Sequence, residues 1–240
     1  MKGFIKLIYL PTCKIYSLLY SVIQIILFSE DWNASIKFLL NQKVVYFEQL
    51  IDIGEFNYDK QKCISDNQFF SRYIQSEKNI NKILEKIYTP EFKKKLLKLT
   101  GFKYRVNYFV LYKTLPLSGV AKDKNIYANF FHFDKPFSMF MSKIFFPIPP
   151  VSNKDGPLEI IDSKNKIISM TCTEPKAFFV FPRKTLHRDS IPEEEHERKQ
   201  IMVQLIPSKK YDISLKIGQS QYKKEPKFPE IKYQMSKIFK

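Results

Sequence analysis

The spacing of apolar side chains changes once along this chain, near residue 101. Before that point, apolar residues recur at intervals of three and four, which is typical of amphipathic helices. After it, short runs of Val, Ile, Phe and Tyr alternate with turn-forming residues, which is typical of strands. We therefore expect a helical region over residues 1–101 that packs on a strand-rich core over residues 102–207.

Local signals define the helices best just before this change. The spacing predicts a helix over Pro90–Lys98, where Thr89 can cap the first turn and proline suits the first helical position. Gly101 is a natural residue to end it. A second helix is expected over residues 77–87, and residues 35–53 are expected to supply another.

The second half of the chain predicts a barrel. Eight short strands without intervening helical patterns disfavour a parallel α/β fold and favour two facing antiparallel sheets. We therefore expect a mainly β fold with N-terminal helices, in which a double-stranded β-helix (a jelly-roll or cupin-like barrel) has helical support. The predicted strands cover residues 103–113, 126–133, 139–147, 157–162, 166–170, 176–182, 184–190 and 199–206.

The two ends of the chain differ from this core. Residues 15–28 form a mostly apolar run that is shorter than the ~20 residues of a spanning helix. We expect a buried amphipathic helix beneath the core; peripheral membrane contact through residues 15–28 is possible but not favoured. Residues 208–240 are expected to form a basic C-terminal tail, so that all three parts make one structural domain.

Charge and cysteine content restrict the partners. The net charge is +16, but only five of the 40 basic residues are Arg, the residue that best reads phosphates and bases. A nucleic-acid partner is therefore unlikely, and a small-molecule substrate is favoured. Three widely spaced cysteines, Cys13, Cys63 and Cys172, form no zinc or disulfide pattern. They indicate a reducing compartment, and we expect the cytoplasm.

Two of the three histidines belong to a candidate metal centre. His132 and Asp134 lie two residues apart at the end of a predicted strand, a spacing that lets both side chains reach one cation. His187 lies in the seventh predicted strand, which neighbours the second in a jelly roll. Two imidazoles and one carboxylate bind Fe(II) on one face and leave the other face open. A zinc site with the same three ligands stays possible.

Further residues predict an acidic co-substrate. Arg198 follows His187 by eleven residues, and its guanidinium could bind the far carboxylate of 2-oxoglutarate in two-point geometry. Lys143 could also reach the site, and Tyr112 could line the co-substrate pocket. The alternative for Arg198 is a solvated charge in the densely charged run 193–199.

Together these residues resemble a known family. His132-Phe133-Asp134, Lys143-Ile144-Phe145-Phe146, the segment Asp155–Ile161 (DGPLEII), His187 and Arg198 are similar to the phytanoyl-CoA dioxygenase-like branch of the Fe(II)/2-oxoglutarate-dependent oxygenases. The resemblance covers residues 100–207. The Gly-Pro pair followed by an apolar strand is its most specific part.

The resemblance implies an enzyme, an oxidoreductase with His132, Asp134 and His187 as its iron ligands and catalytic centre, and Arg198 as the 2-oxoglutarate clamp. It implies Fe(II), 2-oxoglutarate and O2 as cofactor and co-substrates, and hydroxylation of a small organic substrate with succinate and CO2 as co-products. Asp189 stands where the family often has a small residue. A carboxylate near the co-substrate would repel it, unless Asp189 points away or pairs with Arg183 or Arg188.

Two other functions fit the same residues. One is a nucleic-acid dealkylating oxygenase with the same chemistry, suggested by the net charge. The other is a non-catalytic cupin-like binding protein, in which both histidines are merely buried.

Overall fold

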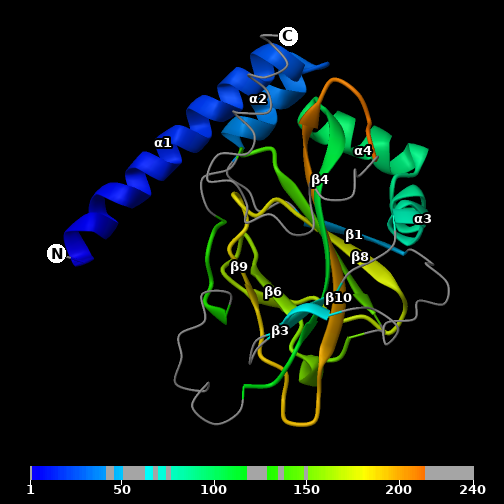
Figure 1. The fold of residues 1–240 in the computed structure, drawn as a ribbon. Coiled ribbons are helices and arrows are strands. Elements are labelled where there is room, and N and C mark those ends of the chain that lie inside the picture. Colours follow the sequence, from blue (N-terminus) through cyan, green and yellow to red (C-terminus); the bar gives the residue numbers. More distant parts are fainter. Residues whose placement is uncertain are drawn as a thin grey trace.

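A computed structural model of the protein describes residues 2–41, 46–50, 63–66, 70–73, 77–117, 129–134, 138–148 and 151–213. Two antiparallel sheets form its body, and four helices lie on one side of it (Figure 1). The helices are α1 (Lys2–Phe28), α2 (Trp32–Leu40), α3 (Glu77–Ile87) and α4 (Pro90–Thr100).

The larger sheet has seven strands in the order β1-β8-β5-β10-β4-β3-β2, and the smaller has three in the order β7-β6-β9. Their pairs are antiparallel throughout. The strands are β1 (Tyr46–Leu50), β2 (Cys63–Asp66), β3 (Phe70–Tyr73), β4 (Lys103–Thr114), β5 (Ser142–Ile148), β6 (Leu158–Ile161), β7 (Ile167–Ser169), β8 (Lys176–Val180), β9 (His187–Asp189) and β10 (Arg198–Ser208).

Most predicted elements are confirmed. Helix α4 begins at Pro90, with Thr89 accepting a hydrogen bond from the Phe92 amide, and it ends at Gly101 in the left-handed conformation. Helix α3 has the predicted bounds, and strands β4 to β10 overlap seven of the eight predicted strands. The exception is 126–133, where His132 forms only an isolated bridge; residues 126–128 lie outside the described residues.

The expectation that residues 1–101 are purely helical is wrong. Residues 35–53 do not form one helix, because α2 ends at Leu40 and residues 46–50 form strand β1. Strand β1 pairs with β8, and β3 pairs with β4, so this part of the chain extends the larger sheet at both edges. The division of the chain at residues 101 and 207 stays a prediction.

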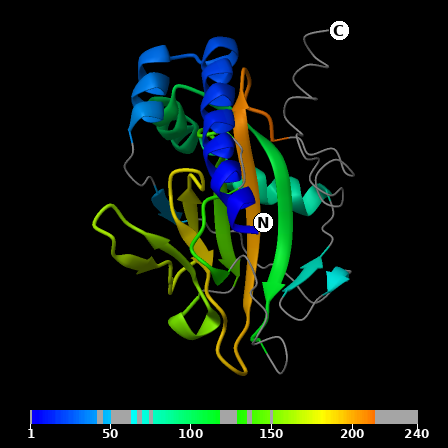
Figure 2. The same cartoon turned by 90° about the vertical axis from the view of Figure 1, so that its left-hand side faces the viewer.

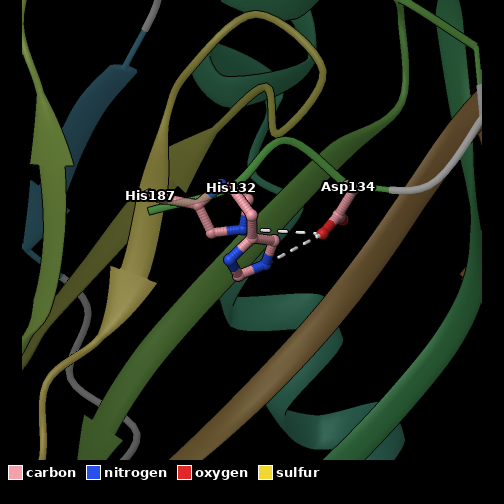
Figure 3. A group of neighbouring side chains, drawn as sticks. All are labelled: His132, Asp134 and His187. Carbon is pink, nitrogen blue, oxygen red and sulfur yellow. Dashed lines mark ion pairs between the residues drawn. The ribbon is translucent and has the colours of Figure 1, made fainter. Parts of the chain in front are cut away.

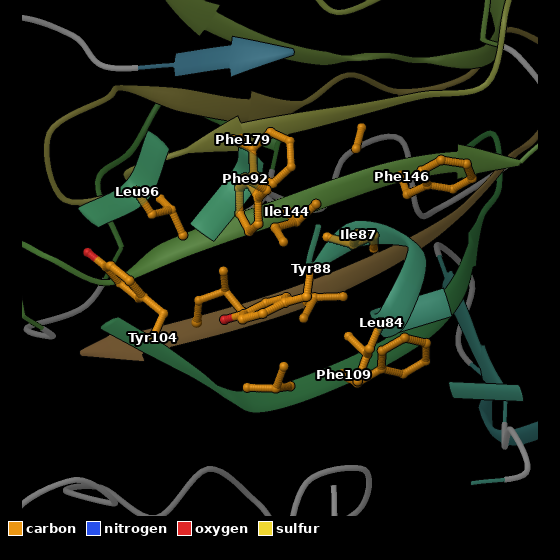
Figure 4. Packing of buried hydrophobic residues seen from close by; sticks show 14 of the residues in the cluster. Leu84, Ile87, Tyr88, Phe92, Leu96, Tyr104, Phe109, Ile144, Phe146 and Phe179 are labelled. Carbon is orange, nitrogen blue, oxygen red and sulfur yellow. The ribbon is translucent and has the colours of Figure 1, made fainter. Parts of the chain in front are cut away.

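The main core lies between the larger sheet and the helices. Successive strand residues point to opposite faces, so every second side chain of β5, β8 and β10 meets the helices. Figure 4 shows aromatic and aliphatic side chains from α3 and α4 packed on these strands. The labelled members include Leu84, Ile87, Tyr88, Phe92, Leu96, Tyr104, Phe109, Ile144, Phe146 and Phe179.

The other face of the larger sheet packs against the smaller sheet. Phe145, Phe178 and Val180 belong to a second buried cluster with Leu158 and Ile160 of β6. Phe145 is flanked by Ile144 and Phe146, which belong to the first cluster, so β5 contributes to both cores. The space between the two sheets is therefore distinct from the helix-packed core.

Helix α1 packs on the rest of the protein largely through polar side chains. Its buried side chains include the polar Ser17, Ser21 and Gln24, and Ser21 Oγ accepts a hydrogen bond of 2.8 Å from the Met139 amide. Gln24 accepts a hydrogen bond from the Ser138 hydroxyl. The prediction of a buried amphipathic helix over residues 15–28 is therefore wrong for most of its apolar side chains, which are exposed, whereas Tyr20 and Ile25 are buried and Ile25 joins the main core. Within the described residues, no helix meets the length and hydropathy needed to span a membrane.

Lys184 connects helix α2 to the turn that precedes β9. Its ammonium donates hydrogen bonds to the carbonyl oxygens of Phe38 and Asn41 at 2.6 and 2.5 Å, where the helix ends. A cation is favourable at this end of a helix. Burial lowers the pKa of Lys184 to about 8, so the group still carries charge at neutral pH. The contact holds the helices against the turn that leads into His187.

Gly101 joins the helices to the first long strand. Its carbonyl accepts hydrogen bonds from the Glu30 and Asp31 amides at 2.9 and 3.3 Å, in the turn between α1 and α2. Its φ of +77° lies in the left-handed region, and a Cβ atom there would lie 2.2 Å from the Asp31 carbonyl oxygen. Only glycine allows both the conformation and this approach.

We predict that Gly101→Ala lowers the free energy of unfolding by roughly 2–4 kcal/mol, because left-handed backbone costs an L-residue ~1–2 kcal/mol and the new methyl group meets backbone. Chemical denaturation measures the loss. Thr89→Ala, which removes only the cap at the other end of α4, is the reference and should cost about 1 kcal/mol. An equal loss in the two variants would contradict the role of Gly101 as a joint.

Candidate metal centre

The His132–Asp134 segment is held by backbone contacts to two later parts of the chain. The His132 amide donates to the His187 carbonyl at 3.0 Å, and the His187 amide donates back to the His132 carbonyl at 3.1 Å. The Asp134 amide donates to the Pro182 carbonyl at 3.1 Å, and Arg183 donates to the Asp134 carbonyl at 2.8 Å. These bonds place the segment beside β9 and fix its position.

The three side chains converge on one point (Figure 3). Nε2 of His132 lies 3.8 Å from Asp134 Oδ1, and Nε2 of His187 lies 3.5 Å from the same oxygen. The imidazole rings are 4.5 Å apart between centroids. One ligand atom from each residue lies within 4.8 Å of the others, which is compatible with a single shared cation.

Both imidazoles are oriented by their own backbone. His132 Nδ1 lies 2.7 Å from the Phe130 carbonyl oxygen, and His187 Nδ1 lies 3.0 Å from the Thr185 carbonyl oxygen. A carbonyl can only accept, so each Nδ1 carries the proton. In the neutral ring Nε2 is then unprotonated and carries a lone pair. Both Nε2 atoms lie near the Asp134 carboxylate, so the two lone pairs face a negative charge. A cation among the three atoms removes that repulsion, and this second hydrogen bond is typical of metal-binding histidines.

The electrostatics keep the ligands in the forms that metals require. Burial is the largest effect on the pKa of His132 and lowers it, so this ring is neutral at pH 7. Burial alone would raise the pKa of Asp134, but the Lys143 ammonium is the largest opposing effect, and that pKa lies well below its usual range. Asp134 is therefore a carboxylate at any pH at which the protein would function.

Lys143 reaches this centre as predicted from the sequence. It lies on β5, and its Nζ is 2.7 Å from Asp134 Oδ2, the oxygen that faces away from the histidines. In the register of the larger sheet, Lys143 stands opposite Gln204 of β10. The ammonium thus lies between the candidate ligands and the larger sheet.

Arg198 is buried rather than solvated, with 1% of its surface exposed. Its guanidinium donates to Asp189 Oδ1 at 2.6 Å, to the Gly156 carbonyl, and to Thr114 Oγ1 at 3.4 Å. Asp189 therefore pairs with Arg198 instead of with Arg183 or Arg188. Arg188 pairs with Glu159 at 2.6 Å instead.

Tyr112 lies next to this ion pair. It stands opposite Gln200 in the β4–β10 register, and the Gln200 amide donates to its hydroxyl. Sequence reasoning missed Gln200 and Gln204, which are both buried. Their signal is the alternation along β10, where Arg198, Gln200 and Gln204 share one face while Ile201, Val203 and Leu205 occupy the helix-packed core.

His196 lies apart from this centre. Its Nδ1 is 3.0 Å from Asp155 Oδ1, in the half-buried loop before β10. It is the only histidine outside the converging group, which makes it a matched control for histidine substitutions.

Comparison with known proteins gives no family assignment. The chain matches no known family model and no curated protein. Among solved structures, it is similar to HygX from Streptomyces hygroscopicus with nickel, 2-oxoglutarate and hygromycin B bound, at 8% identity and a TM-score of 0.46 over 69% of this chain and 84% of that one.

The non-heme alpha-ketoglutarate-dependent epimerase SnoN from nogalamycin biosynthesis has 9% identity and a TM-score of 0.45, over 74% of this chain and 84% of that one. An oxidoreductase of the 2OG-Fe(II) oxygenase family from Burkholderia pseudomallei has 6% identity and a TM-score of 0.37, over 64% and 71% of the two chains. Similarities this low assign neither a family nor a function.

We predict that the purified protein binds one Fe(II), or Co(II) as a spectroscopic substitute, and that His187→Ala and Asp134→Ala each weaken binding by more than about 100-fold. Loss of a ligand should exceed the 10–100-fold typical of its outer hydrogen-bond partners. Anaerobic titration followed by absorption measures this. His196→Ala should bind as tightly as the wild type, and equal weakening in that variant would contradict the assignment.

Proposed function

We propose that the chain is an Fe(II)- and 2-oxoglutarate-dependent dioxygenase that hydroxylates a small organic substrate. The overall reaction converts substrate, O2 and 2-oxoglutarate into hydroxylated substrate, succinate and CO2. The carrying observation is the convergence of His132, Asp134 and His187 on one point, with both Nε2 lone pairs directed at the carboxylate. Bound Fe(II) supplies the oxidising chemistry, and the chain orients the partners.

Iron is favoured over zinc because three ligands on one side leave room for a two-point co-substrate and for O2. The protein's part is to fix which ring nitrogen of His132 and His187 carries the proton in the neutral imidazole, and to keep Asp134 ionised. The hydrogen bonds at Nδ1 do the first, and the Lys143 ammonium supports the second. These side chains are largely shielded from water, which strengthens their interaction with a cation.

Arg198 is our candidate for the 2-oxoglutarate clamp. It lies on the same face of β10 as Gln200 and Gln204, in the register position opposite Thr114. Asp189 already pairs with its guanidinium, so the co-substrate carboxylate would have to share or displace that contact. Tyr112 and Lys143 remain weaker candidates for co-substrate contacts on the neighbouring strands.

The fold supports a double-stranded β-helix. The four central strands of the larger sheet, in the order β8-β5-β10-β4, face a smaller sheet in which His132 continues the β7-β6-β9 order by its bridge to His187. The phytanoyl-CoA dioxygenase-like branch rests on the DGPLEII motif. Gly156 of this motif has a φ of +67° and accepts a hydrogen bond from Arg198, so the motif contacts the proposed clamp.

We also propose a reducing, cytoplasmic setting and a single structural domain. The support for the compartment is the cysteine usage; Cys172, whose side chain the structure describes, is a buried free thiol.

The test is 2-oxoglutarate turnover by the full chain with Fe(II) and O2, measured as succinate release against a metabolite panel. We predict that the wild type releases succinate, that His187→Ala does not, and that His196→Ala does. Adding 2-oxoglutarate to the anaerobic Fe(II) protein should produce a charge-transfer absorption. Metal binding without that absorption or any turnover would favour the non-catalytic cupin-like alternative, and turnover only with alkylated nucleic acid would favour the dealkylating one.

A second prediction concerns the clamp. Arg198→Met should raise the KM for 2-oxoglutarate by about 10–100-fold, because hydrogen bonds between charged groups contribute ~1.5–3 kcal/mol. Asp189→Ser should lower the KM, because it removes a carboxylate that competes for the same guanidinium. Steady-state succinate release measures both constants. An unchanged KM in both variants would assign Arg198 a purely structural role beside Gly156.

A further inference from the structure

The outward face of helix α1 is a continuous apolar row. Its exposed residues lie at spacings of three and four, so they form a single stripe along the helix. Leu19 and Ile23, near its middle, are 59% and 50% exposed. Among the α1 side chains that the structure describes, from residue 15 on, the row consists of Ile15, Leu18, Leu19, Val22, Ile23 and Ile26.

This exposure is a consequence of how the helix is attached. Ser21 and Gln24 bind residues 138 and 139 and are buried together with Tyr20 and Ile25, so the side of α1 that faces the protein is mixed and the side that faces outward is apolar. A surface helix of a water-surrounded protein normally has the opposite orientation. An apolar stripe of this kind marks a surface that is covered by a partner.

Helix α2 adds a second apolar row close to the first. It begins four residues after α1 ends and exposes Trp32, Ile36 and Leu40, at spacings of four. Trp32 is 52% exposed, and tryptophan is enriched where proteins meet the boundary between lipid and water. Figures 1 and 2 show α1 as a long arm whose N-terminal end is free of the sheets in the first view and lies in front of them in the second.

The charge of the helix selects the partner. Helix α1 contains Lys2, Lys6 and Lys14 and no Asp or Glu, in a chain of net charge +16. We propose that the outward face of α1, together with Trp32, docks on an anionic lipid bilayer and lies in its surface. An apolar stripe and an excess of positive charge are the two requirements for binding to such a surface.

A second copy of the chain fits the same surface less well. Pairing two α1 helices through their stripes would bring together helices that carry only positive charge, from molecules that repel one another. Anionic lipid reverses the sign of that interaction. The proposal does not depend on the proposed oxygenase activity.

The experiment is flotation of the full-length protein with vesicles of phosphatidylcholine, with and without phosphatidylserine. The wild type should float with the mixed vesicles, and much less with phosphatidylcholine alone. Leu19→Glu combined with Ile23→Glu should reduce binding at least about ten-fold, because two charges then enter the apolar boundary. Since Trp32 is the only tryptophan of the chain, its emission should shift to the blue in the wild type on binding.

The matched control is Ile167→Glu combined with Ile191→Glu, which places the same charges at exposed apolar positions on β7 and on the loop after β9. It should bind vesicles like the wild type. Circular dichroism verifies folding, and Leu19→Ser with Ile23→Ser serves if the glutamate variant unfolds.

Four results would overturn the proposal. They are no flotation of the wild type, equal flotation of the α1 variant, equal flotation with neutral vesicles, and a dimer in solution that the α1 variant dissociates while vesicles remain unbound. Succinate release measured on the same α1 variant should match the wild type, so failure here is distinguishable from failure of the oxygenase assignment.

Discussion

The candidate metal centre depends on two backbone hydrogen bonds between His132 and His187. They join the segment that contains His132 to β9 of the smaller sheet, where His187 lies 55 positions further along the chain. Because both bonds join the backbones of the two histidines, their side chains start from directly opposite positions on neighbouring backbone segments. The backbone of Asp134, two residues on, is bonded to Pro182 and Arg183, which places its carboxylate within 3.8 Å of both Nε2 atoms. No single element forms the site; it exists only when these contacts do.

Alternation along the strands separates structure from chemistry. On β10 the residues that face the helices are aliphatic, whereas those that face the smaller sheet include Arg198, Gln200 and Gln204. The helix-packed side supplies the stability through tightly packed aromatic side chains. The opposite side can therefore hold buried polar and charged groups, each of which costs free energy unless it is paired. The same strand thus serves a hydrophobic core and a polar interior.

What the sequence could predict follows from how local each signal is. Thr89, Pro90 and Gly101 mark the ends of α4 through contacts within one turn, so they could be identified directly. Strand β1 could not, because residues 46–50 become a strand by pairing with β8, more than 120 residues away. The periodicity of α1 reveals a stripe but not which side faces inward. That depends on the hydrogen bonds of Ser21 and Gln24 to residues 138–139. The candidate ligands were identifiable from residue type and spacing, whereas the partner of Arg198 depended on a loop geometry that spacing does not encode.

The Gly101 carbonyl accepts hydrogen bonds from the turn after α1, and the residue lies two positions before β4, a strand inside the larger sheet. Helix α1 is therefore fixed to the two sheets at this turn as well as through Ser21 and Gln24, instead of being joined by a hinge. If the protein docks on a bilayer through α1, the two sheets would keep one tilt and one height above the bilayer. The candidate metal centre would then stay at a constant distance from the bilayer surface. Hydrophobic molecules that leave the bilayer would reach this centre before they diffuse away.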